Sequence, residues 1–312
     1  MRKKIRIFTD GVPSDYQDSL VPRIIESLGY CIEWSTSQNC DLRIYGPNYR
    51  AQREKSWVPK PLRPFLSPIN KTRIRPSSIS IFQTGENVRQ DFVKADFSIS
   101  FDLAVNSPNH LRLPYWIEVI DWQHEGIAAK KNIRFGAPVK LHRLAQPLGH
   151  NFIKKPHQIA LFSSHLREPR KTLFETVSKI LPTIGFGSYF DKSIEHHNRS
   201  GIRKIEMLNS FAFNLCPENS MHPGYYTEKI PEAFMADCLP LTWTDVNVEI
   251  DFNPKAMLNL APMMASNFDG LHEILTSKSK LNDFVDQPLI LKVPNLDEHK
   301  KFIYEIINQA TS

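Results

Sequence analysis

The chain has 312 residues, 41% of them apolar and 23% charged, and its formal net charge is +6. A chain of this length is usually too long to fold around a single hydrophobic core, so two domains are predicted. No run of about eighteen apolar residues occurs, which excludes an ordinary membrane-spanning helix. The basic N-terminus is followed by too few apolar residues for a signal peptide, and four cysteines without metal-ligand spacing favour a reducing, cytoplasmic compartment.

Basic charge is concentrated in residues 50–76, where eight Lys and Arg residues accompany a single acid, Glu54, and five prolines. The prolines predict an irregular surface loop. This loop is either simply solvated, or it contacts anionic lipid or an acidic glycan, with Trp57 and Phe65 entering the interface. Nucleic acid is not expected as a partner, because no nucleic-acid-binding motif accompanies the charge.

The first half of the chain alternates strand and helix patterns. Short runs rich in β-branched and aromatic residues predict strands at 4–9, 31–36, 41–46, 78–84 and 97–101. Apolar residues on one face predict a helix at 14–30, with Ser14 and Gln17 placed as a capping box. This order predicts an α/β layer with a largely parallel sheet.

A loop-like stretch at 124–157 precedes a second alternating series. Strands are predicted at 157–164, 211–216 and 239–243, and helices at 168–181, 228–237 and 297–309. We therefore expect two α/β domains facing across a cleft, residues 1–150 and 151–312, with the last helix able to pack back on the first domain. In such sheets, ligands bind beyond the carboxyl ends of the strands.

A dense polar motif, from Cys216 to Trp243, connects the strand at 211–216 to the helix that follows it. Thr227 is a suitable N-cap residue for that helix, although Pro231 fits only in a first turn and so allows a start as late as Ile230. Free N–H groups and the helix dipole make such a place an anion site, to which Lys229 adds a full positive charge. Glu228 either accepts sugar hydroxyls or simply stabilises the first helical turn, and the spacing leaves both readings open.

The residues of this motif resemble those of the α-1,3/4-fucosyltransferase family, glycosyltransferase family ten, in its bacterial form. The resemblance rests on Glu218-Asn219, on Gly224 to Lys229, and on Asp251 to Lys255. Upstream, Thr84 to Asn87 is similar to the loop that carries the catalytic carboxylate in bacterial members, and 168–177 resembles the helix whose first-turn arginine reaches the donor phosphates.

The resemblance implies a GT-B fold of two Rossmann-like domains and an inverting transfer of L-fucose from GDP-β-L-fucose to a glycan hydroxyl. The product would be an α-1,3 or α-1,4 fucoside, in protein glycosylation or in a bacterial surface polysaccharide or lipopolysaccharide. Glu86 would be the general base. The residues expected to bind the donor are Arg170, Glu218, Asn219, Tyr225, Thr227, Glu228 and Lys229.

Further expectations follow from the resemblance. The first domain would bind the glycan acceptor and the second GDP-fucose. No cofactor or metal would be required, with a divalent metal at most stimulatory, because Lys229 and Arg170 carry positive charge at the diphosphate and the chain has no Asp-x-Asp motif. The enzyme would lie in the cytoplasm, with peripheral contact to the inner face of the cytoplasmic membrane through residues 50–76.

One departure from the family pattern keeps alternatives open. Thr244 stands where family members usually have a glycine, and a β-branched residue does not readily adopt a positive φ. The chain could therefore use a different nucleotide sugar. It could also be a noncatalytic glycan-binding protein, although a binding protein has no evident use for a cluster like Glu86, Glu228 and Lys229.

Overall fold

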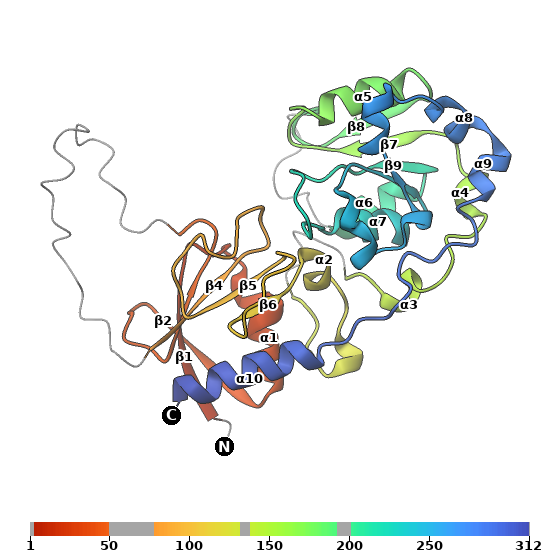
Figure 1. Ribbon diagram of the computed structural model, residues 1–312. Coiled ribbons are helices and arrows are strands. Elements are labelled where there is room, and N and C mark those ends of the chain that lie inside the picture. Colours follow the sequence, from red (N-terminus) through yellow and green to blue (C-terminus); the bar gives the residue numbers. More distant parts are fainter. Residues whose placement is uncertain (1–2, 50–77, 132–137, 192–200, 312) are drawn as a thin grey trace, which may run out of the picture.

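The computed structural model describes residues 3–49, 78–131, 138–191 and 201–311. Two α/β domains are visible, each built on its own sheet, and they lie side by side with contact along one edge (Figure 1). Within the described ranges, no helix is both long and apolar enough to cross a bilayer. The basic segment 50–76, together with its predicted membrane contact, lies outside the described residues.

The first domain contains a six-stranded parallel sheet in the order β2-β1-β3-β4-β5-β6. The five predicted strands are confirmed, whereas β6 was not predicted, because it is only three residues long and two of them are His and Arg. The strands are β1 (Lys3–Asp10), β2 (Tyr30–Ser35), β3 (Leu42–Tyr45), β4 (Ile79–Gln83), β5 (Phe97–Ser100) and β6 (His110–Arg112).

The predicted first helix begins later than expected. A short 3-10 turn, Tyr16–Asp18, precedes α1 (Leu20–Ser27), and Ser19 occupies the N-cap position without a side-chain cap. The capping box proposed for Ser14 and Gln17 is therefore wrong. The first free N–H of α1, that of Leu20, instead bonds to a carboxylate oxygen of Glu118, which lies 98 residues along the chain.

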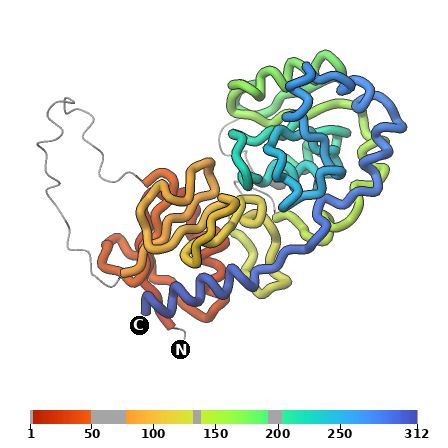
Figure 2. Tube along the Cα trace, viewed as in Figure 1, coloured from red at the N-terminus to blue at the C-terminus, as the bar shows by residue number. Residues whose placement is uncertain are grey.

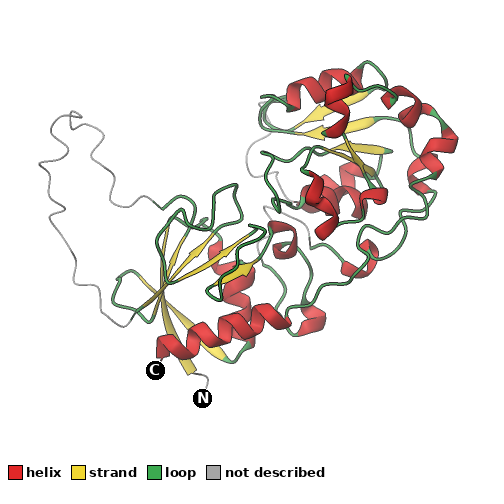
Figure 3. Cartoon of the chain, in the orientation of Figure 1, coloured by secondary structure: helices red, strands yellow, loops and turns green. Residues whose placement is uncertain are grey.

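The second domain has a five-stranded parallel sheet in the order β11-β10-β9-β7-β8. The three predicted strands are confirmed, whereas β8 and β11 were not predicted. The strands are β7 (Ile159–Phe162), β8 (Thr183–Phe186), β9 (Phe213–Leu215), β10 (Leu239–Thr242) and β11 (Leu258–Asn259). Figure 3 shows helices on both sides of these strands, as in a doubly wound sheet.

Two predicted helices of this domain are present as α5 (Arg170–Ser178) and α7 (Lys229–Met235). Glu228, not Thr227, is the N-cap residue of α7, so the predicted cap is wrong. The remaining helices are α2 (Tyr115–Glu118), α3 (Leu141–Leu144), α4 (Asn151–Lys154), α6 (Gly201–Leu208), α8 (Leu271–Thr276), α9 (Lys278–Asn282) and α10 (Asp297–Thr311).

The C-terminal helix returns to the first domain. The tube in Figure 2 follows α10 from the second domain to the side of α1, which it contacts. The Phe302 ring meets the edge of Phe97 at 5.8 Å between centroids, and Lys300 pairs with Glu125 at 2.9 Å. Among the described residues, every strand of the first sheet precedes residue 150 and every strand of the second follows it.

A bidentate ion pair joins the domains beside the sheet edge. The Arg112 guanidinium, on β6, donates to both oxygens of Asp251 at 3.0 and 2.5 Å. Next to it, the Trp116 ring packs on Phe252 with 5.0 Å between centroids. Asp251 and Phe252 thus connect the second domain to the first. The bidentate Arg112–Asp251 pair is planar and partly buried, so it fixes the relative orientation of the two side chains as well as their distance.

Gly224 is a point of close approach between the polar motif and the first domain. Its φ is +87°, and a Cβ atom built on it would lie 2.3 Å from the carbonyl oxygen of Phe101. No side chain fits there, so only glycine permits this contact. The residues that follow Gly224 are in this way placed against the carboxyl ends of the first domain's strands.

Candidate functional site

A cavity of about 390 Å³ lies where the two domains meet. The second domain contributes Asn219, Tyr225, Thr227, Glu228 and Lys229 to its lining. The first domain contributes a larger and more varied wall, formed by Val12, Pro13, Asp15, Tyr16, Ser19, Pro47, Asn48, Gln83, Thr84, Gly85, Glu86, Leu113, Tyr115, Glu118 and Lys130. Six of the eight residues predicted from the sequence line this cavity; Arg170 and Glu218 do not.

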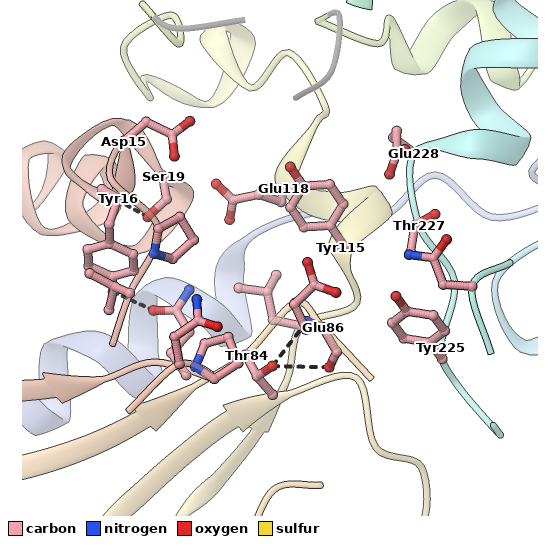
Figure 4. A pocket seen from close by; sticks show the side chains of 18 of the residues that line it. Asp15, Tyr16, Ser19, Thr84, Glu86, Tyr115, Glu118, Tyr225, Thr227 and Glu228 are labelled. Atoms are coloured by element: carbon pink, nitrogen blue, oxygen red, sulfur yellow. Dashed lines mark hydrogen bonds between the residues drawn. The ribbon is translucent and has the colours of Figure 1, made fainter. Parts of the chain in front are cut away.

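Glu86 faces the cavity from the loop after β4. Its side chain is exposed, and Figure 4 shows the carboxylate below the Tyr115 ring, with Tyr225 and Thr227 of the other domain on the opposite side of the space. Two hydrogen bonds of 3.0 Å close the loop, since Thr84 Oγ1 receives the Glu86 N–H and donates to the Glu86 carbonyl. Gly85 permits the Tyr115 ring to lie on this loop, because a Cβ there would come within 2.8 Å of the ring.

Glu218 has a different environment from the one expected. Its side chain is fully buried and both carboxylate oxygens are occupied within the motif. One accepts the Thr227 N–H at 2.8 Å, and the other accepts the Thr227 hydroxyl at 2.8 Å and Lys229 Nζ at 3.1 Å. Glu218 therefore holds Thr227 and Lys229 in place from behind the cavity wall rather than facing it.

Lys229 and Glu228 form the charged end of the cavity. Lys229 Nζ bonds to Thr227 Oγ1 at 2.8 Å and lies 3.9 Å from Glu228. Burial alone would lower the pKa of Lys229, but Glu218 and Glu228 raise it, so the amine stays charged. Burial would raise the pKa of Glu228, but Lys229 and Lys204 together hold it below its ordinary value. The cavity thus presents a fixed cation beside an ionised carboxylate.

Arg170 reaches the site indirectly. It is the first residue of α5, and one guanidinium nitrogen donates to Asn219 Oδ1 at 2.8 Å while the other donates to Ser163 Oγ at 3.1 Å. His165 Nε2 lies 3.2 Å from the second nitrogen. Burial and the nearby Arg170 and Arg167 charges lower the pKa of His165, which favours a neutral ring that can accept from Arg170. Arg170 therefore fixes Asn219, which lines the cavity.

Tyr225 links the two walls. It is buried, and its ring meets the edge of Phe101 in the first domain with 4.9 Å between centroids. Burial raises the pKa of its phenol, so the hydroxyl remains protonated and can donate a hydrogen bond at neutral pH. Together with Gly224, this contact aligns the motif of the second domain with the loop that carries Glu86.

Sequence reasoning missed several cavity residues of the first domain, notably Asp15, Tyr16, Gln83, Tyr115 and Lys130. They come from segments that show no common motif, so only folding brings them together. Glu118 had one signal in the sequence, since it is a lone carboxylate in an otherwise apolar run, Leu113 to Ile120. A carboxylate buried in such a run needs a partner or a function.

Thr244 does not introduce strain. It is buried, its φ is outside the positive region, and its backbone exchanges hydrogen bonds with the Asn259 side chain at 3.2 and 2.9 Å. The residue does not line the cavity. Within the described ranges, no three His, Cys, Asp or Glu side chains are grouped in a way that could hold a metal ion.

Two family models match the sequence. The Alpha-(1,3)-fucosyltransferase FucT N-terminal domain matches residues 57–118, and the Glycosyltransferase family 10 (fucosyltransferase) C-terminal model matches residues 152–277. The curated Alpha-(1,3)-fucosyltransferase FucT of Helicobacter pylori is 28% identical over 211 residues, which are 61% of this chain and 42% of that protein. The chain thus spans less than half the length of this relative.

Crystal structures of an alpha1,3-fucosyltransferase share the fold. The structures with GDP-fucose and with GDP each superpose with a TM-score of 0.67 at 20% and 21% identity, covering 98% of this chain and 91% of theirs. The architecture is therefore that of a GT-B glycosyltransferase, with an α/β fold of two Rossmann-like domains facing across a cleft. The chain belongs to glycosyltransferase family 10, the fucosyltransferases.

Proposed function

We propose that this protein transfers L-fucose from GDP-β-L-fucose to a glycan hydroxyl with inversion, forming an α-1,3 or α-1,4 fucoside. The observation that carries the proposal is the cavity between the domains, which is lined by Glu86 on one side and by Lys229, Glu228 and Tyr225 on the other. One wall offers a carboxylate that can take a proton. The other offers a fixed positive charge, which suits a leaving diphosphate.

In this proposal, Glu86 removes the proton of the acceptor hydroxyl as that oxygen attacks the anomeric carbon of fucose. Lys229 stabilises the negative charge that develops on departing GDP, and Glu228 accepts hydroxyl groups of the donor sugar or ribose. Asn219, Tyr225 and Thr227 complete the donor contacts. Glu218 and Arg170 support the site as positioning residues, because their own hydrogen bonds go to Thr227, Lys229 and Asn219.

The proposal includes no required cofactor. Lys229, held by Glu218 and Thr227, would carry the charge that a divalent cation carries in other transferases, so a metal would at most stimulate transfer. We also propose that the enzyme acts in the cytoplasm on a bacterial surface polysaccharide or lipopolysaccharide precursor. Contact of residues 50–76 with anionic lipid at the inner face of the membrane belongs to the same proposal.

The test is a transfer assay with the full chain, GDP-fucose and neutral acceptors, namely lactose and N-acetyllactosamine, with the product linkage read by NMR. Formation of an α-fucoside is expected. Parallel reactions with GDP-mannose and UDP-galactose address the alternative of another nucleotide sugar. Glycan binding without turnover of any donor would instead identify a binding protein and overturn the proposal.

Glu86→Gln tests the base within the same assay. The amide keeps the shape but cannot accept the proton, so kcat should fall roughly 10²- to 10⁴-fold while the affinity for GDP-fucose is kept. Asp91→Asn, an exposed carboxylate outside the cavity, is the matched control and should retain wild-type rates. A Glu86→Gln enzyme with more than about a tenth of wild-type kcat would remove Glu86 from the role of base.

A further inference from the structure

Glu118 is a second carboxylate in the cavity, and it differs from Glu86 in its environment. It ends the short helix α2, is only 6% exposed, and nevertheless lines the cavity. Its Oε1 accepts the Leu20 N–H at 2.5 Å. Among the described residues, no hydrogen bond joins Oε2 to a protein group. Figure 4 shows the carboxylate in the space between Ser19 and Tyr115.

A carboxylate oxygen in a cavity lining can accept a hydrogen bond from a donor group that enters the cavity. Burial raises the pKa of Glu118, whereas the positive charges of Lys130 and Arg23 favour its ionised form, and the negative charge of Asp15 opposes it. Neither cation makes an ion pair with Glu118 within 4.0 Å in the described structure, and Arg23 donates elsewhere, to the Ala128 carbonyl at 3.0 Å. With respect to the described residues, Oε2 is therefore available to a donor that enters the cavity.

Tyr115 provides an aromatic wall beside this oxygen. Its ring lies on Gly85, next to Glu86, and in Figure 4 it separates Glu118 from the donor-side residues Thr227 and Glu228. Burial raises the pKa of its phenol, so the ring is uncharged. Aromatic faces pack against the C–H face of a sugar ring, while carboxylates accept hydrogen bonds from its hydroxyls.

We propose that Glu118 is a specificity determinant for the acceptor: Oε2 accepts a hydrogen bond from a second hydroxyl of the acceptor sugar, whose ring packs on Tyr115 while its nucleophilic hydroxyl meets Glu86. This inference rests on the proposed function and extends it to the acceptor. The first-domain wall carries Asp15, Glu86 and Glu118 against one cation, Lys130. The sugar in this subsite is therefore uncharged, and an acidic or sulfated sugar is rejected.

Glu118→Gln tests the assignment with little change in shape. The Leu20 N–H retains the amide oxygen as its acceptor, so the amide NH₂ group faces the cavity and a hydrogen-bond acceptor becomes a donor. The acceptor KM for N-acetyllactosamine should rise about tenfold to hundredfold, while the KM for GDP-fucose changes by less than about twofold. Glu26→Gln, an exposed carboxylate on α1, is the matched control.

A series of monodeoxy N-acetyllactosamines then identifies the hydroxyl. Deletion of one hydroxyl other than the nucleophile should raise the KM of the wild-type enzyme more than about tenfold and have little further effect in Glu118→Gln, because the interaction is already lost there. N-acetyllactosamine sulfated on its acceptor sugar should be a poor substrate of the wild-type enzyme and a better one of Glu118→Gln. If Glu118→Gln melts too early for kinetics, Glu118→Asp takes its place in the same series.

The outcomes separate this inference from the proposed function. A wild-type chain that transfers fucose to no acceptor overturns both. An active wild type whose acceptor KM is unchanged by Glu118→Gln, or whose deoxy-sugar penalties are equal in the two enzymes, overturns only the role of Glu118. A parallel loss in kcat, both KM values and melting temperature would mark Glu118 as a structural anchor of α1, and that result also rejects the inference.

Discussion

Glu218→Gln is the substitution that best separates support of the site from donor contact. The carboxylate is fully buried, and it receives the Thr227 N–H and hydroxyl and the Lys229 amine. In the variant, the amide oxygen can still accept from Thr227, but the amide NH₂ then faces the Lys229 ammonium. The buried cation loses its nearer counter-charge, keeps only Glu228 at 3.9 Å, and meets a second donor.

The expected cost follows from the geometry of this pair. Removal of one partner of a buried ion pair costs about 3–5 kcal/mol, and the lower end applies because the Lys229 side chain is 18% exposed. About 3 kcal/mol corresponds to a fall in melting temperature of roughly 6–12 °C for a domain of this size. GDP binding should weaken as well, since Lys229 loses the contact that holds it.

The pH dependence of this loss of stability follows from the pKa of Lys229. Glu218 raises the folded-state pKa of Lys229 above its ordinary value of 10.5. A raised amine pKa contributes stability that is fully present below 10.5 and is lost only as the pH rises through the folded value. The difference in melting temperature between Glu218→Gln and the wild type should therefore be constant between about pH 6 and pH 9.

A double variant provides the decisive assay. Lys229→Met alone leaves the buried Glu218 carboxylate unpaired, whereas the double variant Glu218→Gln/Lys229→Met removes both charges. The free energy of unfolding of the double variant should therefore be about 1–3 kcal/mol higher than the sum of the two single losses predicts. The double variant should still bind GDP poorly, because the cation is gone. Calorimetric melting and GDP titration on the same preparations give both quantities. Additive losses, or a Glu218→Gln protein that melts like the wild type, would contradict the reasoning.

Two other predictions concern the domain contact and the buried carboxylate of the first domain. Gly224→Ala should destabilise the contact with Phe101, because its Cβ would lie 2.3 Å from a carbonyl oxygen at a φ of +87°; transfer should fall more than about tenfold while GDP titration shows nearly unchanged affinity. Burial raises the folded-state pKa of Glu118 above 4.5, so its contribution to stability is fully present below that pH and declines as the pH rises through the folded value. Relative to wild type, Glu118→Gln should therefore gain melting temperature between about pH 4 and pH 7, and a constant difference across that range would show that Glu118 titrates normally.

The residues that the sequence predicted best lie in contiguous segments. The stretch from Gly224 to Lys229 and the loop around Glu86 each keep their chemistry within a few residues, so their composition and spacing are visible without a structure. Glu218 shows the limit of such reasoning. Its place in the motif was clear, but the direction of its carboxylate, toward Thr227 and Lys229, depends on how the loop folds over it.

Helix starts were predicted less well than strands. The eight predicted strands follow from apolar, β-branched runs, which bury both faces in a doubly wound sheet, whereas β6, β8 and β11 show no such run. The start of α1 does not follow from its own sequence, because the free Leu20 N–H is bonded by Glu118 from a distant segment. The capping box expected at Ser14 is replaced by this tertiary bond. At α7, the Thr227 hydroxyl donates to Glu218 instead of capping the helix, and Glu228 takes the N-cap position.

The sequence by itself determined the two α/β domains, the polar motif of the second and the carboxylate loop of the first, because each is encoded in local periodicity and short spacing. The tertiary structure alone decided which carboxylates share a cavity. Glu86, Glu118 and Asp15 come from three separate elements and line one cavity with Lys229, where contacts such as Gly224 on Phe101 and the Arg112–Asp251 pair join the two domains. Sequence patterns record how each element buries its own face, but they do not record the distance between side chains on different elements.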